Sequence, residues 1–254
     1  MTRKIRLDQL LVSKGLAQSR ERARALILAG VVRVNDQVVS KAGTPVASDA
    51  RITLDEPDHP WVGRGGLKLA HALDTFQIDP AGYTALDIGA STGGFTDVLL
   101  QRGAARVVAL DVGRGQLDWR LRTDSRVVVV EGVNARYLTP QDLPDGLREF
   151  DLVTIDVSFI SLRQILPSVP PLLRRDGHIV ALVKPQFEAE RSEIGSGGIV
   201  RDPNVQARAV ADVTDAAHQI GLVRLAVTES PVTGVEGNRE FLLLLCSAPA
   251  SSPA

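Results

Sequence analysis

Seven short apolar runs between residues 61 and 246, separated by stretches with helical periodicity, constrain this chain most strongly. They cover residues 85–88, 107–111, 127–130, 152–156, 178–184, 222–227 and 240–245. Continuous apolar strands that alternate with helices are typical of a parallel sheet covered on both faces. We therefore predict an α/β domain with a doubly wound, mostly parallel seven-stranded sheet, whose last strand is a candidate for antiparallel pairing.

Ionisable residues stand at the end of four of these apolar runs. Asp87, Asp111, Asp156 and Lys184 each terminate a run. In open parallel sheets, ligands bind outside the carboxyl ends of the strands. One acid at a strand end is unremarkable, but four charged groups along one edge are not explained by solubility. The pattern predicts a functional site at this edge.

The first run leads into a glycine-rich turn that predicts a nucleotide-type cofactor. Glycines let the backbone turn sharply and pass close to a ligand. Ser91 replaces the second glycine of the dinucleotide fingerprint, and the Lys-Ser/Thr of a phosphate loop is absent. An acid 22 residues after Gly89 suits ribose hydroxyls. Together these features favour S-adenosylmethionine over a nicotinamide cofactor. The predicted contacts are Asp87, Gly89, Ala90, Ser91, Thr92, Gly93, Gly94, Phe95 and Asp111.

The first 41 residues are basic, in contrast to the rest of the chain. They carry nine Lys/Arg against three acids, a net charge of +6, and the remainder carries −7, for a total of −1. Residues 6–12 and 20–29 have helical patterns, and residues 31–39 read as two short strands around Asn35-Asp36. A basic head on an acidic body suggests binding to a polyanion. A solvated basic face is the alternative.

The composition indicates the cellular compartment. The single cysteine, Cys246, permits no intramolecular disulfide, which fits a reducing compartment. Residues 1–9 lack the apolar stretch of a signal peptide, and the run 241–246 is too short to span a bilayer. We expect a cytoplasmic protein. No metal is expected, since the four histidines show no ligand spacing.

The helix–helix–hairpin pattern of the head resembles the S4 RNA-binding domain over roughly the first 55 residues. The resemblance rests on the spacing of Leu7, Leu10, Leu11, Gly15, Ser19, Ala23, Ile27 and Gly30 together with the basic residues. It implies contacts with RNA phosphates. We predict an S4-like domain at 1–58, a linker at 59–65, a second domain at 66–247 and a disordered tail at 248–254. The predicted RNA-binding residues are Arg6, Ser19, Arg20, Arg24, Arg33, Lys41 and Arg64, although Arg64 is equally placed to close the linker.

The body resembles FtsJ-like 2′-O-methyltransferases, a class I methyltransferase group with a Rossmann-like fold. The resemblance rests on the order Lys68, Asp156, Lys184, Glu240, within the segments 156–160, 184–188 and 237–241. With the S4-like head, the chain is similar to the TlyA family, also labelled haemolysin A. The resemblance implies methylation of a ribose 2′-hydroxyl in 16S or 23S ribosomal RNA, on cytidine, with ribosomal subunits as partners.

The same resemblance implies roles for single residues. Lys184 would take the proton of the hydroxyl, Lys68 would orient it, and Asp156 and Glu240 would hold the two amines. A lysine near other positive charge can act as a base when desolvation lowers its pKa. Asn134 and Asp156 would also contact the cofactor. The chain departs from its relatives before Trp61, where His59-Pro60 replaces a basic residue.

Three alternative functions remain open from the sequence, one of them a nicotinamide oxidoreductase, against which the altered glycine turn counts. The chain is also compatible with a noncatalytic RNA-binding factor, and the haemolysin label suggests a membrane-lytic protein, although no amphiphilic segment supports that. The four charged residues would then be ordinary surface ion pairs. The glycine-rich segment 195–201 is either a lid over the substrate or a plain surface loop.

Overall fold

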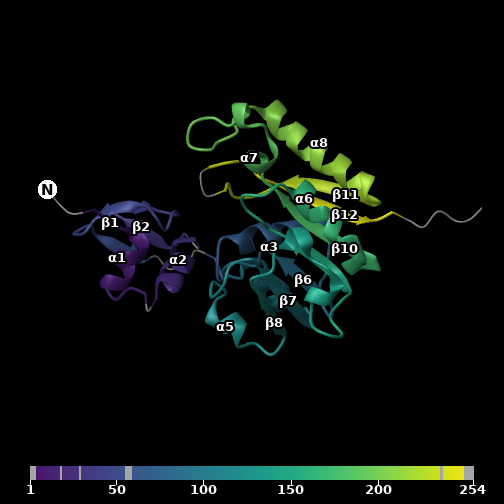
Figure 1. Cartoon of the computed structure of the whole chain (residues 1–254), viewed down its shortest axis with the longest axis horizontal. Coiled ribbons are helices and arrows are strands. Elements are labelled where there is room, and N and C mark those ends of the chain that lie inside the picture. The colour runs from purple at the N-terminus through teal and green to yellow at the C-terminus, as the bar shows by residue number, and fades with distance from the viewer. Residues whose placement is uncertain (1–3, 18, 29, 55–58, 235–236, 249–254) are drawn as a thin grey trace, which may run out of the picture.

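The computed structural model of the chain describes residues 4–17, 19–28, 30–54, 59–234 and 237–248, arranged as a small N-terminal unit and a larger body (Figure 1). Residues 55–58, at the end of the predicted S4-like domain, and residues 249–254 of the predicted tail lie outside the described residues. Within the described part, no helix has the length and apolar character needed to cross a membrane.

The N-terminal unit, called the head below, has two helices and five short strands. Apolar residues on one side of each helix form its core, including Leu7, Leu11 and Ile27, which are fully buried. This confirms the two predicted helices and the hairpin, in which Asn35 and Asp36 have positive φ values of 50° and 66°. Three further strands of three residues each were too short for a periodic signal. The elements are β1 Lys4–Arg6, α1 Leu7–Ser13, α2 Arg20–Leu28, β2 Val32–Val34, β3 Gln37–Val38, β4 Pro45–Ala47 and β5 Ile52–Leu54.

The body is built on one seven-stranded sheet with the order β11-β12-β10-β9-β6-β7-β8. Strand β12 runs antiparallel to both of its neighbours, and the remaining pairs are parallel. The predicted sheet and its antiparallel last strand are confirmed. The strands are β6 Thr84–Ile88, β7 Arg106–Asp111, β8 Val127–Glu131, β9 Phe150–Ile155, β10 Leu173–Val183, β11 Leu222–Glu229 and β12 Phe241–Ser247.

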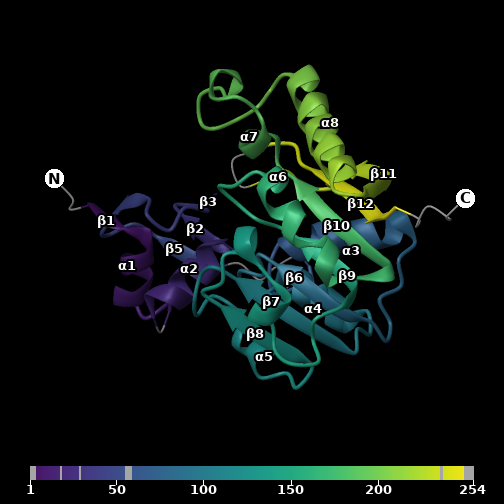
Figure 2. The same ribbon diagram turned by 45° about the vertical axis from the view of Figure 1, so that its right-hand side comes forward.

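Helices cover both faces of this sheet (Figure 2). Alternate side chains of the strands point to opposite faces, so Leu86 and Ile88 pack with α6 and α8, whereas Ala85 packs with α3 and α4. The helices are α3 Gly65–Phe76, α4 Gly94–Gln101, α5 Trp119–Arg122, α6 Leu162–Ile165, α7 Pro185–Glu188 and α8 Pro203–Gln219. Five short 3₁₀ helices are η1 Ala135–Tyr137, η2 Pro140–Asp142, η3 Leu166–Ser168, η4 Pro170–Leu172 and η5 Arg191–Glu193.

The strand order reverses at β6, which pairs with β7 on one side and β9 on the other. The connections leaving these strands therefore diverge, and a crevice opens beside the carboxyl end of β6. The glycine-rich turn follows β6, and Asp156 follows β9. The topology thus places both sequence features at the same crevice.

Two arginines connect the head to the body. Arg22 of α2 donates a hydrogen bond from Nη1 to the carboxylate of Asp118 at 3.0 Å. The methylenes of Arg64 lie against Gly30, and its guanidinium donates to the carbonyl of Thr233 at 3.4 Å. Trp61 packs on the body, against Gly66 and the apolar cluster that contains α3 and α4. Arg64 is consequently a junction residue that also faces the pocket described below.

Candidate active site

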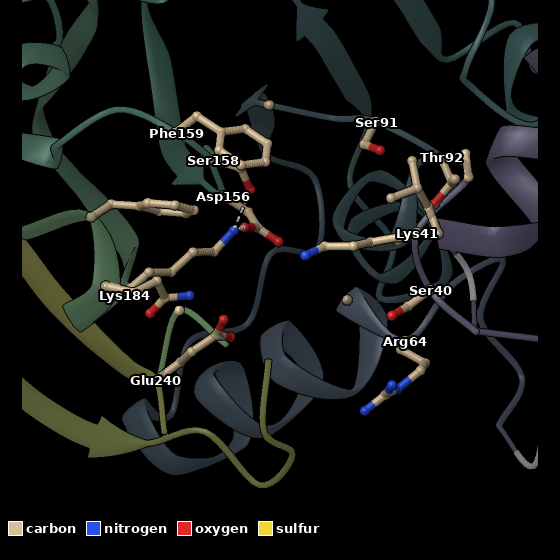
Figure 3. Close-up of a pocket in the computed structure, with 18 of the residues that line it drawn as sticks. Ser40, Lys41, Arg64, Ser91, Thr92, Asp156, Ser158, Phe159, Lys184 and Glu240 are labelled. Carbon is tan, nitrogen blue, oxygen red and sulfur yellow. Dashed lines mark hydrogen bonds and ion pairs between the residues drawn. The ribbon is translucent and has the colours of Figure 1, made fainter. Parts of the chain in front are cut away.

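A pocket of about 910 Å³ opens at the carboxyl edge of the sheet, between the body and the head (Figure 3). The body contributes the glycine-rich turn and the ends of β9 and β10. The head contributes Leu28 and segment 40–45. The amine of Lys41 points from this segment toward Asp156 (Figure 3). The head is therefore part of the wall of the pocket, and a ligand inside it would meet both units.

The first ion pair in the pocket joins the ends of adjacent parallel strands. Lys184 follows β10 and Asp156 follows β9, and Nζ of Lys184 lies 2.6 Å from Oδ1 of Asp156. The same amine donates to Oγ of Ser158 at 3.0 Å. The side chains of Lys184 and Asp156 are 10% and 21% exposed. Both are accessible from the pocket yet largely withdrawn from bulk water.

The second ion pair joins residues 172 positions apart in the sequence. Lys68 lies in the first turn of α3, and Glu240 directly precedes β12. Nζ of Lys68 donates to Oε2 of Glu240 at 2.5 Å, and the two side chains are only 11% and 3% exposed. A buried pair of this kind costs desolvation energy, so it is poor evidence for stability alone. Its position in the pocket wall points to function.

The two ion pairs form one electrostatic cluster. Burial raises the pKa of Asp156, but the positive charges of Lys184 and Lys68 outweigh burial and hold the pKa below its usual range. Asp156 is therefore an anion that interacts with both amines. The structure brings together all four residues that the sequence analysis assigned to catalysis, from α3 and the ends of β9, β10 and the segment before β12.

The glycine-rich turn is held in place by packing against the backbone of Asp156 and by hydrogen bonds to the carboxylate of Asp111. Gly89 has a φ of +84°, and a Cβ atom there would overlap the carbonyl of Asp156. The carboxylate of Asp111 accepts from the backbone N–H groups of Ser91 (2.8 Å) and Gly113 (2.7 Å). Asp111 is partly exposed and retains further acceptor capacity. The turn is thus fixed before any ligand binds.

Not every predicted cofactor residue lines the pocket. Gly89, Ala90, Ser91, Thr92, Gly94, Phe95 and Asp156 do, but Asp87, Gly93, Asp111 and Asn134 do not. Asn134 is exposed and its side chain accepts from the N–H of Arg136 at the start of η1. Asp87 is fully buried, and hydroxyls of Thr96 (2.6 Å) and Thr154 (3.0 Å) donate to its two oxygens. Asp87 supports the turn rather than facing the pocket.

Comparison with known proteins shows the family. A profile described as FtsJ-like methyltransferase matches residues 61–246, and the S4 domain profile matches residues 5–52. The chain belongs to the FtsJ-like methyltransferase family. Its head is an S4 domain.

Relatives with the same two parts cover nearly the whole of this FtsJ-like methyltransferase. The chain is 48% identical to the 16S/23S rRNA (cytidine-2′-O)-methyltransferase TlyA of Mycobacterium tuberculosis, over 96% of this chain and 91% of the relative. It is also 48% identical to YqxC of Bacillus subtilis, over 96% and 86%. A solved structure from Streptococcus thermophilus, named as a hemolysin, matches with a TM-score of 0.74 at 42% identity, over 98% of this chain and 90% of that one. The resemblance to the TlyA family is confirmed.

The S4 head of this FtsJ-like methyltransferase organises its arginines around one acid. Arg6, Arg20 and Arg24 all lie within 3.5 Å of the fully buried carboxylate of Asp8. The hydrogen bond from Arg6 lowers the pKa of Asp8 far below its usual range, against the opposing effect of burial. The three arginine side chains remain nearly half exposed. Asp8 thus fixes three predicted RNA-binding side chains while leaving donors toward solvent.

The other predicted RNA-binding residues occupy three different positions. The hydroxyl of Ser19 accepts from the N–H of Arg22 and so caps α2. Arg33 donates to the carbonyl of Asp36 in the hairpin turn. Lys41 and Arg64 line the pocket itself. Among the described residues of the head, Arg6, Arg20 and Arg24 thus form one cluster around a shared acid.

Sequence reasoning assigned no role to several pocket residues, among them Ser158 and Phe159, which stand two and three positions after Asp156. Ser158 bonds Lys184, and Phe159 is 91% exposed on the pocket rim. The signal was the loop itself, since residues at the end of a central parallel strand face the crevice. The sequence could not separate the roles of the two side chains, because the direction of the Phe159 ring depends on an unusual backbone φ of +65°.

Buried Asp87 leads to a prediction about pH and stability. Burial raises its pKa to about 7, although bonds from Thr96 and Thr154 oppose the rise. The unfolded chain releases this proton near its ordinary pKa of 3.8, whereas the folded chain keeps it until about pH 7. The carboxyl therefore reduces the free energy of unfolding as pH rises from 4 to 7. Relative to wild type, we therefore expect the free energy of unfolding of Asp87→Asn to rise by on the order of 3–4 kcal/mol between pH 4 and pH 7.

Urea unfolding of both proteins at several pH values checks this. Asn can keep both threonine contacts, so packing is conserved. The Asp145→Asn variant is the control, because the side chain of Asp145 is 96% exposed and should give a pH-independent difference. A flat difference for Asp87→Asn as well would mean that Asp87 is already ionised in the folded protein.

Proposed function

We propose that this protein transfers a methyl group from S-adenosylmethionine to the 2′-hydroxyl of a ribose in ribosomal RNA, on a cytidine as in the named TlyA relative. The observation that carries the proposal is the convergence of Lys68, Asp156, Lys184 and Glu240 on one pocket beside a glycine-rich turn. Ribosomal RNA as substrate implies ribosomal subunits as partners and the cytoplasm as the site of action.

The residues of the crevice fit the methyl donor. When bound, S-adenosylmethionine supplies a methyl group on a sulfonium cation. The turn 89–94 offers close backbone approach, the carboxylate of Asp156 faces the pocket, and Asp111 offers free lone pairs next to Ser91. A carboxylate is a suitable neighbour for a cation, and an acid after the second strand is suited to ribose hydroxyls. We assign the donor to these residues, with Asp87 holding the turn.

The two ion pairs have different roles at the substrate hydroxyl. Nζ of Lys184, once it has lost its own proton, would accept the proton of the hydroxyl as the oxygen takes the methyl group and the carbon–sulfur bond of the donor breaks, leaving S-adenosylhomocysteine. The ammonium group that results remains beside Asp156 and Ser158, which stabilise it. Lys68, held by Glu240, lies close enough to affect Asp156 and orients the attacking oxygen. Alignment of the two reactants contributes up to about 7–11 kcal/mol in favourable systems.

Radiolabelled methyl transfer tests the proposal. Purified protein is incubated with labelled S-adenosylmethionine and with ribosomal subunits or naked ribosomal RNA, and the modified position is mapped. We expect label on a ribose 2′-oxygen. Label on a base, or RNA binding with no transfer under any condition, would favour another methylation chemistry or a noncatalytic RNA-binding protein.

Phe159 gives a prediction about substrate binding. Its ring is 91% exposed on the pocket rim, its backbone is in the left-handed region, and its centroid lies 5.3 Å from that of Phe187. Such a backbone costs about 1–3 kcal/mol and needs a reason. Stacking of a base on an aromatic ring contributes about 1–3 kcal/mol. We expect Phe159→Ala to raise KM for RNA about 5–100-fold, with donor affinity unchanged.

Steady-state kinetics with RNA, and calorimetry with the donor, measure the two effects separately. Phe159→Trp keeps a stacking surface and should retain a KM close to that of wild type. An alanine variant with unaltered KM, or a tryptophan variant as poor as alanine, would remove the stacking role.

A further inference from the structure

Asn238 is a buried amide with its side chain committed to one loop. It is 1% exposed. Its Oδ1 accepts from the N–H of Val200 at 2.9 Å, and its Nδ2 donates to the carbonyl of Gly198 at 2.9 Å. Both ends of the amide therefore bind the same short segment, 38 to 40 residues earlier in the sequence. Without this amide, the N–H of buried Val200 and the carbonyl of half-buried Gly198 would lose their partner, which is costly.

The bound segment forms part of the pocket. Gly195 and Ile199 pair as an isolated antiparallel bridge, so residues 195–199 make a tight hairpin. Ile194 and Gly198 line the pocket. On its far side, the amide of Gln206 in α8 donates to the carbonyl of Val200 at 2.8 Å. The hairpin is consequently anchored by two buried amides, one on each side of Val200.

Asn238 also lies within the turn that places Glu240. The carbonyl of Asn238 accepts from the N–H of Gly234 at 2.8 Å, and the carbonyl of Glu240 accepts from the N–H of Ser230 at 2.8 Å. Gly234 packs so closely on Glu240 that a Cβ atom would overlap Oε1. The carboxylate paired with Lys68 is therefore held between Gly234 and the amine. Gln206 makes no bond to this turn in the described residues.

We propose that Asn238 is a positioning residue that connects the hairpin 195–199 to Glu240. Its side chain fixes the hairpin as a wall of the substrate pocket. Its backbone, through Gly234, fixes the carboxylate that holds Lys68. This inference rests on the proposed methyl transfer, because the consequence of misplacing Lys68 is read as slower turnover.

Two matched variants test separately whether Asn238 fixes the hairpin and whether it fixes the carboxylate of Glu240. Asn238→Ala and Gln206→Ala each remove one buried amide from Val200, but only Asn238 is also part of the Glu240 turn. We expect Gln206→Ala to raise KM for RNA severalfold with kcat within about twofold of wild type. We expect Asn238→Ala to raise KM similarly and to lower kcat at least about tenfold. Donor affinity, measured by calorimetry, should stay within about twofold in both.

Hydrogen exchange provides a readout that does not depend on activity. Because the N–H of Val200 donates to Asn238, its exchange should accelerate in Asn238→Ala while α8 remains protected. Equal kcat in Asn238→Ala and wild type, or an equal loss in both alanine variants, would overturn the link to Glu240. Unchanged exchange at Val200 would overturn the anchoring of the hairpin.

Gly234→Ala tests the Glu240 half without removing a buried hydrogen bond. The added Cβ must displace the carboxylate, and we expect kcat to fall at least about tenfold with KM near wild type. Full activity of Gly234→Ala would contradict the proposal even if Asn238→Ala failed to fold. If wild type itself transfers no methyl group to any RNA, the proposed function fails instead, and hydrogen exchange still decides the anchoring.

Discussion

Lys184→Ala is expected to lower the rate of methyl transfer by about 10²–10⁴-fold while RNA and donor binding persist. The variant removes the amine that lies 2.6 Å from Asp156 and 3.0 Å from Ser158. The loss should therefore fall on kcat rather than on KM, and single-turnover assays with saturating RNA and donor measure it.

Two controls make the Lys184 result specific. Lys184→Arg keeps a positive charge beside Asp156 but cannot accept a proton near neutral pH, so it should be nearly as inactive as alanine. Lys14→Ala removes a lysine from an exposed site in the head and should leave kcat unchanged. An active arginine variant would show that Lys184 contributes charge and position, not proton transfer.

The second large effect is expected from the Lys68–Glu240 pair. Glu240→Met leaves a nearly buried ammonium group without its partner, which costs about 3–5 kcal/mol of unfolding free energy. The double variant Lys68→Met/Glu240→Met replaces both charges with apolar side chains of similar volume. We expect it to recover most of that stability, because apolar replacement of a whole buried pair is often neutral or stabilising.

Activity should behave differently from stability in the same series. Glu240→Met leaves Lys68 without the carboxylate that holds it, and the double variant lacks the amine, so methyl transfer should fall at least about 100-fold in both. Denaturant unfolding and methyl transfer are measured on the same preparations. Recovery of transfer in the double variant would show that the pair only stabilises the fold. Failure of the double variant to regain stability would mean that the pair itself stabilises the protein.

Regular periodicity made the fold readable from the sequence. Long apolar runs identified all seven strands of the body, and the acids and lysine that end them identified the functional edge. The reason is physical, because a buried parallel strand must be apolar until it reaches the crevice. Strands β1, β4 and β5 of the head carry no such signal, since three residues cannot show an alternation.

Contacts between distant residues explain most of what the sequence could not provide. Lys68 and Glu240 were assigned by resemblance, and nothing in their local sequence shows that they touch across 172 positions. Asp87 and Asp111 both lie near the end of an apolar run, but Asp87 pairs with Ala109, two positions before Asp111, and is sealed under threonine hydroxyls while Asp111 remains partly exposed. Burial of that kind depends on which helix covers a strand end, and a single sequence does not specify it residue by residue.

Because segment 40–45 of the head closes one side of the pocket, RNA binding and methyl transfer depend on the same surface. A change that tilts the head would reshape the chamber in which the hydroxyl reacts, even if every body residue kept its place. An S4 domain transplanted from a relative would have to carry a segment that complements this side of the pocket. Natural variation at this rim is therefore under two demands at once, which restricts how independently the two halves of the protein can evolve.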